Sequence, residues 1–208
     1  MNTFNTVPLD QFSHEDRYKF LMASVLPRPV ALVTTISEGG VLNAAPFSCY
    51  TVLSVTPPIF GVSVGLKADG SEKDTLRNLR ARGECVLHIP NVAMARQVNL
   101  AGQDCEAHIS EIALAGWHVV DAVKVGAPRI VEAPIQFECV LRDIVEYGDR
   151  RSALCVVEAV HTHAADGVVQ GHRVDHALLD ALGRIGGGAY CSARDAFSAP
   201  AAAEPFQR

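Results

Sequence analysis

The first half of the chain alternates short hydrophobic runs with strong breaks, a pattern typical of β-strands. Residues 29–36, PVALVTTI, form a β-branched run, and Glu38-Gly39-Gly40 supplies a hairpin-type break after it. The run at 41–55 is longer; Pro46 interrupts it and Thr56-Pro57-Pro58 stops it. Because proline cannot donate a hydrogen bond to a neighbouring strand, Pro46 predicts an edge strand, a bulge or backbone exposed to a ligand.

The remainder of the chain continues in the same way. Shorter strand candidates lie at residues 59–65, 84–90 and 167–171. Residues 133–147 alternate apolar and polar positions, which predicts a strand with one buried face and one face in water. Residues 152–163 are expected to pair with that strand across a hairpin turn at 148–150.

Helical spacing is confined to a few short segments. These are residues 75–82, which end at Gly83 as a C′ residue, residues 91–103, with Asn91 as N-cap, and residues 175–182, capped by Asp175. Residues 104–128 carry a weak pattern that indicates loop and short pieces. Strands in hairpin-like succession without regular helical crossovers predict a mainly β fold, an antiparallel barrel or sandwich rather than a doubly wound parallel sheet.

Length and composition narrow the class of protein. The 208 residues are 49% hydrophobic and 20% charged, which fits one globular domain over 1–208, with 1–20 as an N-terminal extension and 198–208 as a flexible tail. The net charge of -5 argues against nucleic acid as a partner. The first 20 residues lack the basic and apolar regions typical of a secretory signal, and no apolar run reaches membrane-spanning length, so no membrane is expected. Six cysteines without a CxxC pair indicate small buried hydrophobes in the cytoplasm.

One polar stretch suggests an anion site. The segment GLKADGSEKDTLRNLR, residues 65–80, places Lys67, Lys73, Thr75 and Arg77 around a helix start at Ser71 or Asp74. The first amides of a helix have no partner within it and carry the positive end of its dipole, so they favour an anion such as a phosphate. The alternative is a capping box of Ser71 and Asp74 with solvated basic residues around it. No nucleotide-binding fingerprint occurs.

Six segments, taken in order, resemble a known family. They are LPRPVALVTT, GVLNAAPFSCY, TPPIFGVSVG, KDTLRNLRARGECVLHIPN, APIQFEC and LLDALGRIGGGAYCSARD. Over about residues 20–195 the chain is similar to the flavin reductase-like, FMN-binding split-barrel family. More narrowly, it resembles the branch with the reductase components of two-component flavin monooxygenases and the flavoredoxins.

The resemblance implies an antiparallel Greek-key split β-barrel with a few flanking short helices, a homodimer, and FMN, or FAD, at the barrel edge. By the same likeness, the ribityl chain and ring lie along Asn43, Ala44, Ala45, Pro46, Phe47 and Ser48, above Ser63, Val64 and Gly65. The phosphate is expected at Lys73, Asp74 and Thr75. Arg184 and Tyr190 are expected on the substrate side or at the partner subunit. Phe47 either packs on the ring or belongs to the core, and for Phe60 the core is favoured.

Three functions follow as alternatives. The first is an NAD(P)H:flavin oxidoreductase that uses NADH or NADPH, with a flavin-dependent monooxygenase as a possible partner. The second is an FMN-binding electron carrier. The third is a metal-dependent hydrolase built on His161, His163, His172 and His176. Because the expected helix start at Asp175 separates the last two histidines, solvent-facing histidines without a metal are favoured over a zinc or iron site.

Overall fold

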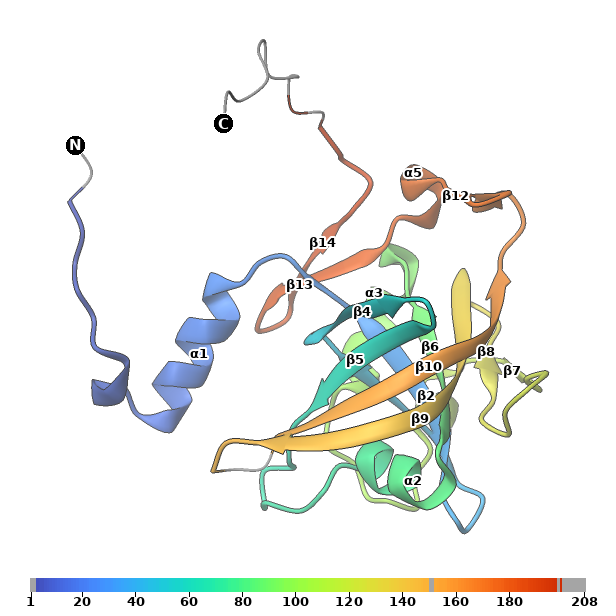
Figure 1. Ribbon diagram of the computed structural model, residues 1–208, viewed down its shortest axis with the longest axis horizontal. Coiled ribbons are helices and arrows are strands. Elements are labelled where there is room, and N and C mark those ends of the chain that lie inside the picture. The colour runs from blue at the N-terminus through green and yellow to red at the C-terminus, as the bar shows by residue number, and fades with distance from the viewer. Residues whose placement is uncertain (1–2, 150–151, 198, 200–208) are drawn as a thin grey trace.

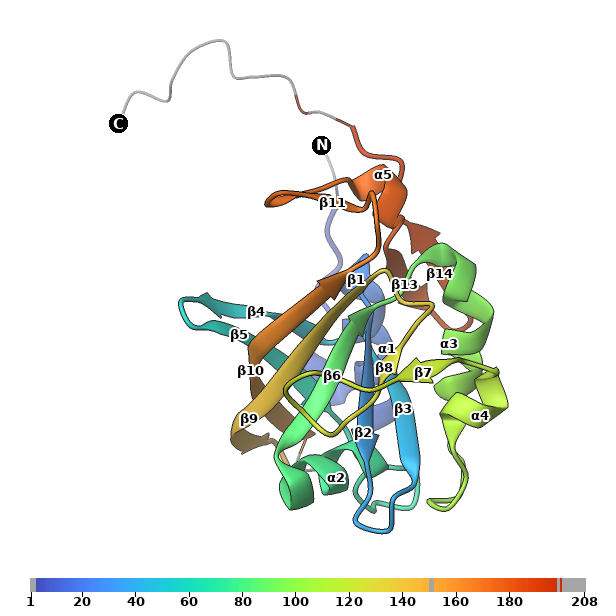
Figure 2. The ribbon, with the colours of Figure 1, turned by 90° about the vertical axis from the view of Figure 1, so that its right-hand side faces the viewer.

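Seven antiparallel strands form the centre of the protein and curl into a split barrel (Figures 1 and 2). The computed structural model describes residues 3–149, 152–197 and 199. In spatial order the strands are β3 (Leu42–Phe47), β2 (Ala31–Ile36), β6 (Glu84–Ile89), β9 (Ile135–Tyr147), β10 (Ser152–Ala164), β5 (Pro58–Val64) and β4 (Tyr50–Val55). Strands β3 and β4 are the two edges, and residues 48–49 join them in a bend.

Smaller elements surround the barrel. A three-stranded sheet contains β1 (Arg28–Pro29), β13 (Leu182–Gly186) and β14 (Ala189–Ser192); β7 (Val119–Val120) pairs with β8 (Arg129–Ile130), and β11 (Val169–Gln170) with β12 (Arg173–Val174). The α-helices are α1 (His14–Ser24), α2 (Asp74–Arg82), α3 (Ala95–Ala101), α4 (Glu111–Ala115) and α5 (His176–Leu179), and the 3-10 helices are η1 (Leu9–Gln11) and η2 (Val92–Met94). No helix among the described residues is long and apolar enough to cross a bilayer.

Three residues that were expected to mark an edge strand, a helix end and a helix start are confirmed in these positions. Pro46 lies on β3, an edge strand, where no neighbour needs its missing N–H. Helix α2 ends at Gly83, which adopts the left-handed conformation at φ 70°. The Asp175 side chain accepts hydrogen bonds from the backbone N–H groups of Ala177 and Leu178 and so caps α5.

Other expectations were wrong in detail. The run at 41–55 is two strands rather than one, because the chain bends after Phe47. Asn91 occupies the predicted N-cap position, but it precedes a 3-10 turn and its side chain makes no capping bond. The glycine-rich stretch at 186–188 is the tip of the β13–β14 hairpin, whose two short strands carry no clear strand pattern in the sequence. The predicted tail falls on residues 198–208, of which only 199 is described.

The polar face of β9 was predicted to be solvated, which is confirmed for the exposed Arg142 but wrong for the first half of the strand. Gln136 and Glu138 are both buried, because residues 121–133 cover this face of the barrel. Glu138 accepts backbone hydrogen bonds from Val123 at 2.8 Å and from Lys124 at 2.5 Å. Burial alone would raise the pKa of Glu138, but these N–H groups and the nearby His163 lower it below its ordinary value. The alternation therefore identified the two faces of β9, but it did not show that the chain covers the polar face at Gln136 and Glu138.

Two large apolar clusters, and a smaller third one of Val86, Val125 and Ala127, stabilise the molecule. One fills the barrel and includes Phe47 and Phe60, with Phe60 in ring contact with Phe137 at 5.0 Å between centroids. This confirms the core position expected for Phe60. The second cluster lies between β2, β3 and the helices α3 and α4, and includes the buried Trp117. Removing such apolar surface from water contributes most of the free energy of folding.

The fully buried His88 gives the first prediction. Its Nδ1 donates to the Leu32 carbonyl at 2.9 Å and its Nε2 accepts from the Ile130 N–H at 2.9 Å, so the folded ring is neutral. Burial lowers the pKa of His88 to about 4. The unfolded chain takes up this proton at a higher pH than the folded chain, so the free energy of unfolding falls as pH drops from about 6.5 to 4.

The His88→Gln variant keeps one donor and one acceptor but cannot titrate. We expect its pH dependence across that window to be weaker than wild type by about 3 kcal/mol. Urea unfolding at a series of pH values measures this, with the exposed His172→Gln as the matched control. Equal pH slopes for wild type and His88→Gln would contradict the assignment of a neutral buried ring.

Candidate functional site

An elongated groove runs along the open edge of the barrel. One part, of about 540 Å³, lies between β3, the end of β5, the start of α2 and the segment after α3. A second part, of about 570 Å³, continues between β3, α1 and the β13–β14 hairpin. Both parts share Tyr18, Met22, Pro46, Phe47, Ser48 and Gly102 as wall residues. Each part is large enough for a bound small molecule.

The α2 end of the groove has the properties of an anion site. Helix α2 begins at Asp74, and Leu76 and Arg77 donate their N–H groups to the Lys73 carbonyl. Among the described residues, the N–H groups of Asp74 and Thr75 donate to no protein acceptor. These free amides and the helix dipole favour a negatively charged group at this point.

The alternative of a capping box is wrong. The Ser71 hydroxyl donates to the Asp69 carboxylate at 2.6 Å and does not cap the helix. The N-cap residue is Lys73, whose side chain makes no capping bond. The sequence had the right types of residue for a cap, but the loop turns so that Ser71 points back toward Asp69.

Lysines reach the same end of the groove. Lys67 pairs with Asp74 at 2.8 Å, and Lys73 pairs with the half-exposed Asp104 at 3.2 Å. Asp74 also pairs with Arg77. Partial burial would raise the pKa of Asp74, but the bonds from Lys67 and Arg77 lower it below its ordinary value, so the carboxylate stays ionised and neutralised. Asp74 therefore does not oppose an anion at the free amides as an unpaired carboxylate would.

A buried polar network fixes the helix start against the barrel. The Asn43 side chain donates to the hydroxyl of Thr75 at 3.1 Å and to that of Thr35 at 3.2 Å. Asn78 donates to the same Thr35 hydroxyl at 3.0 Å. All four side chains are buried, and they join α2 to β2 and β3. The amides of the anion site consequently hold a fixed position relative to the groove wall.

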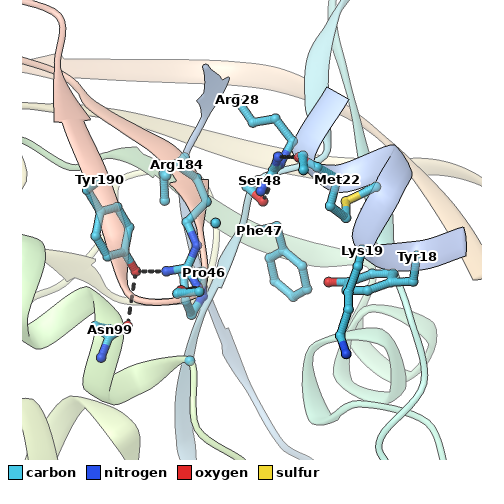
Figure 3. A pocket seen from close by; sticks show the side chains of 15 residues that line it. Tyr18, Lys19, Met22, Arg28, Pro46, Phe47, Ser48, Asn99, Arg184 and Tyr190 are labelled. Atoms are coloured by element: carbon cyan, nitrogen blue, oxygen red, sulfur yellow. Dashed lines mark hydrogen bonds between the residues drawn. The ribbon is translucent and has the colours of Figure 1, made fainter. Parts of the chain in front are cut away.

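The other end of the groove is more aromatic (Figure 3). Arg184 and Tyr190 lie on one side of Phe47, and Tyr18 lies on the other. The Arg184 guanidinium stands 4.6 Å from the centroid of the Tyr190 ring and donates to its hydroxyl and to the Gly187 carbonyl. Flat, partly cationic surfaces of this kind suit a planar ligand.

Arg28 connects helix α1 to this part of the groove. The side chain is buried and donates to the carbonyls of Met22 and Val25 at the end of α1. It also donates to the Ser48 hydroxyl at 3.3 Å (Figure 3). One guanidinium thus holds α1, which supplies Tyr18 and Met22, beside β3.

Most of the predicted site residues meet in this groove. Its α2 part is lined by Asn43, Ala45, Pro46, Phe47, Ser48, Ser63, Gly65, Lys73, Asp74 and Thr75, and its second part by Arg184 and Tyr190. Ala44 and Val64 do not line it, because their side chains point to the opposite faces of their strands and are fully buried. The Ala44 N–H donates to the buried Glu111 carboxylate instead.

Several wall residues were missed. Tyr18 lies within the supposed N-terminal extension, and α1, His14–Ser24, runs across its boundary at residue 20. The helix has little amphipathic signal and buries no residue. Glu111 and Cys105 come from the stretch interpreted as loop. The Cys105 thiol donates to the Glu111 carboxylate. Burial, together with the neighbouring Glu111, raises the pKa of Cys105 to about 11.

The histidine cluster divides in two. His172 and His176 are exposed and lie apart in a β-turn and at the start of α5. His161 and His163 lie together on β10, with ring centroids 4.9 Å apart. His163 is not solvent-facing as expected, because it donates to the buried Glu138 at 2.6 Å.

The fold and groove define a β-barrel protein whose open edge carries an elongated groove, with features of an anion site at one end and flat aromatic surfaces at the other. Comparison with known proteins makes this class specific. Residues 22–185 match the flavin reductase-like domain family, and the chain belongs to that family.

Solved structures agree with this assignment. Nitrilotriacetate monooxygenase component B from Bacillus cereus superposes with a TM-score of 0.91 at 32% identity, over 96% of this chain and 100% of that chain. The 2-nitrobenzoate 2-nitroreductase NbaA of Pseudomonas fluorescens gives 0.86 at 28% identity, over 98% and 100%. A split-barrel protein of Shewanella frigidimarina, described as a putative flavin reductase, gives 0.81 at 17% identity, over 93% and 96%, and so shares the fold.

Proposed function

We propose that the groove binds FMN, with the phosphate at the start of α2. The observation that carries this proposal is the pair of free N–H groups at Asp74 and Thr75, flanked by Lys67 and Lys73, at one end of a groove lined further along by Pro46 and Phe47. A monophosphate needs a single anion corner of this kind, which favours FMN over FAD.

The residues present fit the parts of this cofactor. The two amides and the lysines would hold the phosphate, and the strand segment from Asn43 to Ser48 would run beside the ribityl chain. Backbone of β3 beyond Pro46 is on a sheet edge and can bond the polar rim of the ring. The Phe47 side chain, buried but part of the groove wall, would support its apolar side.

We further propose that the protein is an NAD(P)H:flavin oxidoreductase. A flavin accepts a hydride from reduced nicotinamide and passes the electrons on, so the protein must bring two flat molecules together and exclude water. The second part of the groove, between Tyr18, Arg184 and Tyr190, offers room for the second flat molecule. The likeness to a monooxygenase component supports a separate oxygenase as the user of the electrons. An electron carrier without this nicotinamide reaction is the alternative.

Two further points belong to this proposal. All six cysteines are free thiols, which supports the reducing cytoplasm as the compartment.

A homodimer is supported by exposed apolar side chains on two separate elements. Helix α1 stands away from the barrel (Figure 1) and exposes Phe20 and Leu21, and edge strand β4 exposes Val52 and Val55, the latter at 83%.

The phosphate assignment gives the second prediction. Lys73→Ala and Thr75→Ala should each weaken FMN binding by about 1 to 3 kcal/mol, through loss of charge-assisted or hydroxyl bonds to the phosphate. Fluorescence quenching of FMN measures the affinity. Arg82→Ala, at the other end of α2, removes a charge from the same helix and should bind FMN as wild type does. Unchanged affinity in the double variant would rule out this phosphate site.

The third prediction concerns the electron donor. Under anaerobic conditions, NADH or NADPH should bleach the flavin absorbance of the protein–FMN complex within seconds, as typical enzyme turnover requires. Stopped-flow absorbance with each nicotinamide measures the rate, and dithionite serves as the control for a reducible flavin. Full reduction by dithionite with no reaction toward either nicotinamide would replace the reductase by the electron carrier.

The fourth prediction concerns assembly. The full chain should sediment at twice its 22.3 kDa mass at micromolar concentration. A Val52→Asp, Val55→Asp double variant should shift the species toward monomer, because charged residues would enter the apolar contact. Val174→Asp, at an exposed position of β12, should leave the dimer intact. A wild-type monomer with full FMN occupancy would exclude the proposed assembly.

A further inference from the structure

A group of metal-ligand side chains lies on the outer face of β9 and β10. Glu138, His161 and His163 each offer one ligand atom, and these three atoms all lie within 4.8 Å of one another. The group is separate from the groove: the end of β10, with β7 and β8, lies on the opposite side of the barrel from α1 and β13 (Figures 1 and 2).

A β-bulge at Val160 brings the histidines to this face. Ala159 pairs with Cys139 in the barrel core, whereas His161 pairs with the next residue of β9, Glu138. Simple alternation from Ala159 would direct His161 and His163 into the barrel. The extra residue inverts the alternation and places both rings on the side of Glu138. Bulges often redirect side chains at functional sites.

Glu138 is oriented as a ligand would be. Its carboxylate is fully buried and accepts the N–H groups of Val123 and Lys124, so it cannot turn away from the histidines. Such hydrogen bonds to a ligating carboxylate are the usual outer support of a metal site. His163 contacts the same carboxylate at 2.6 Å, whereas His161 makes no hydrogen bond among the described residues and has ring nitrogens available for a ligand.

We propose that Glu138, His161 and His163 bind a divalent transition-metal ion, Zn²⁺ first, through one carboxylate oxygen and two imidazole nitrogens. Imidazole with carboxylate is a donor set that suits Zn²⁺ and disfavours Mg²⁺, which prefers oxygen ligands. Zinc bonds of about 2.1 Å place the ligand atoms roughly 3.4 Å apart. The 2.6 Å hydrogen bond from His163 to Glu138 must therefore open, with release of the His163 ring proton, and His161 must approach the other two ligands. Rotation of His161 can supply this, because its ring is only partly buried. Three protein ligands leave the fourth position open to solvent.

The test is a zinc titration of the tag-free full-length chain after treatment with EDTA and dialysis. Isothermal titration calorimetry should give one Zn²⁺ per chain, and zinc should raise the midpoint of thermal unfolding. His161→Ala should lower zinc affinity by about tenfold or more. Since His161 makes no hydrogen bond, the metal-free thermal midpoint and the FMN content of this variant should match wild type.

Matched controls separate a built site from surface binding. His172→Ala removes an exposed histidine from the nearby β11–β12 turn and should bind zinc as wild type does. His163→Gln should also lose zinc binding. Because this substitution breaks a contact with Glu138, the effect of zinc on its thermal midpoint is compared with the metal-free midpoint of the same variant. Zinc uptake by wild type no greater than by His161→Ala, or an equal loss in His172→Ala, would overturn the proposal.

Discussion

The groove depends on one buried set of hydrogen bonds, the network of Asn43, Thr35, Asn78 and Thr75. It joins an edge strand, its neighbour and the first turn of α2, so the two free amides of that turn cannot move independently of the groove wall. Leaving a buried side-chain amide without its hydrogen-bond partner costs more free energy than the bond itself contributes. Other arrangements of these four side chains are therefore disfavoured. The position of the anion corner is therefore a property of the barrel and not of a surface loop.

The sequence contained most of this arrangement where the local chemistry has a single solution. Pro46 was expected on an edge strand, at a bulge or in backbone exposed to a ligand, and it lies on an edge strand. Gly83 was expected to end a helix and Asp175 to cap one, and both do. The groove residues on β3 and α2 were named from the resemblance to a family, in which the order of the motifs along the chain indicates the site positions. The spacing of residues alone does not indicate them. Their meeting in one groove follows from the antiparallel order of the strands.

What could not be predicted depends on contacts between distant segments. The sequence of β9 predicts that Gln136 and Glu138 face solvent, because nothing in this strand indicates that residues 121–133 cover it. Helix α1 has almost no apolar face of its own, so its place beside the groove is set by Arg28, which reaches back from the following strand. His161 and His163 are two positions apart, so a strand places them on one face, but their meeting with Glu138 required a bulge that alternation does not reveal.

The attachment of α1 outside the barrel core, largely through Arg28, has a practical consequence for how the protein is handled. The barrel core does not include α1, so a chain shortened to begin near residue 28 would keep its interior packing and its seven-stranded sheet. It would also lose one whole wall of the groove, including Tyr18 and Met22. Good expression and a cooperative melt are consequently poor guides to the integrity of this chain, since the part that folds most firmly is not the part that encloses the ligand.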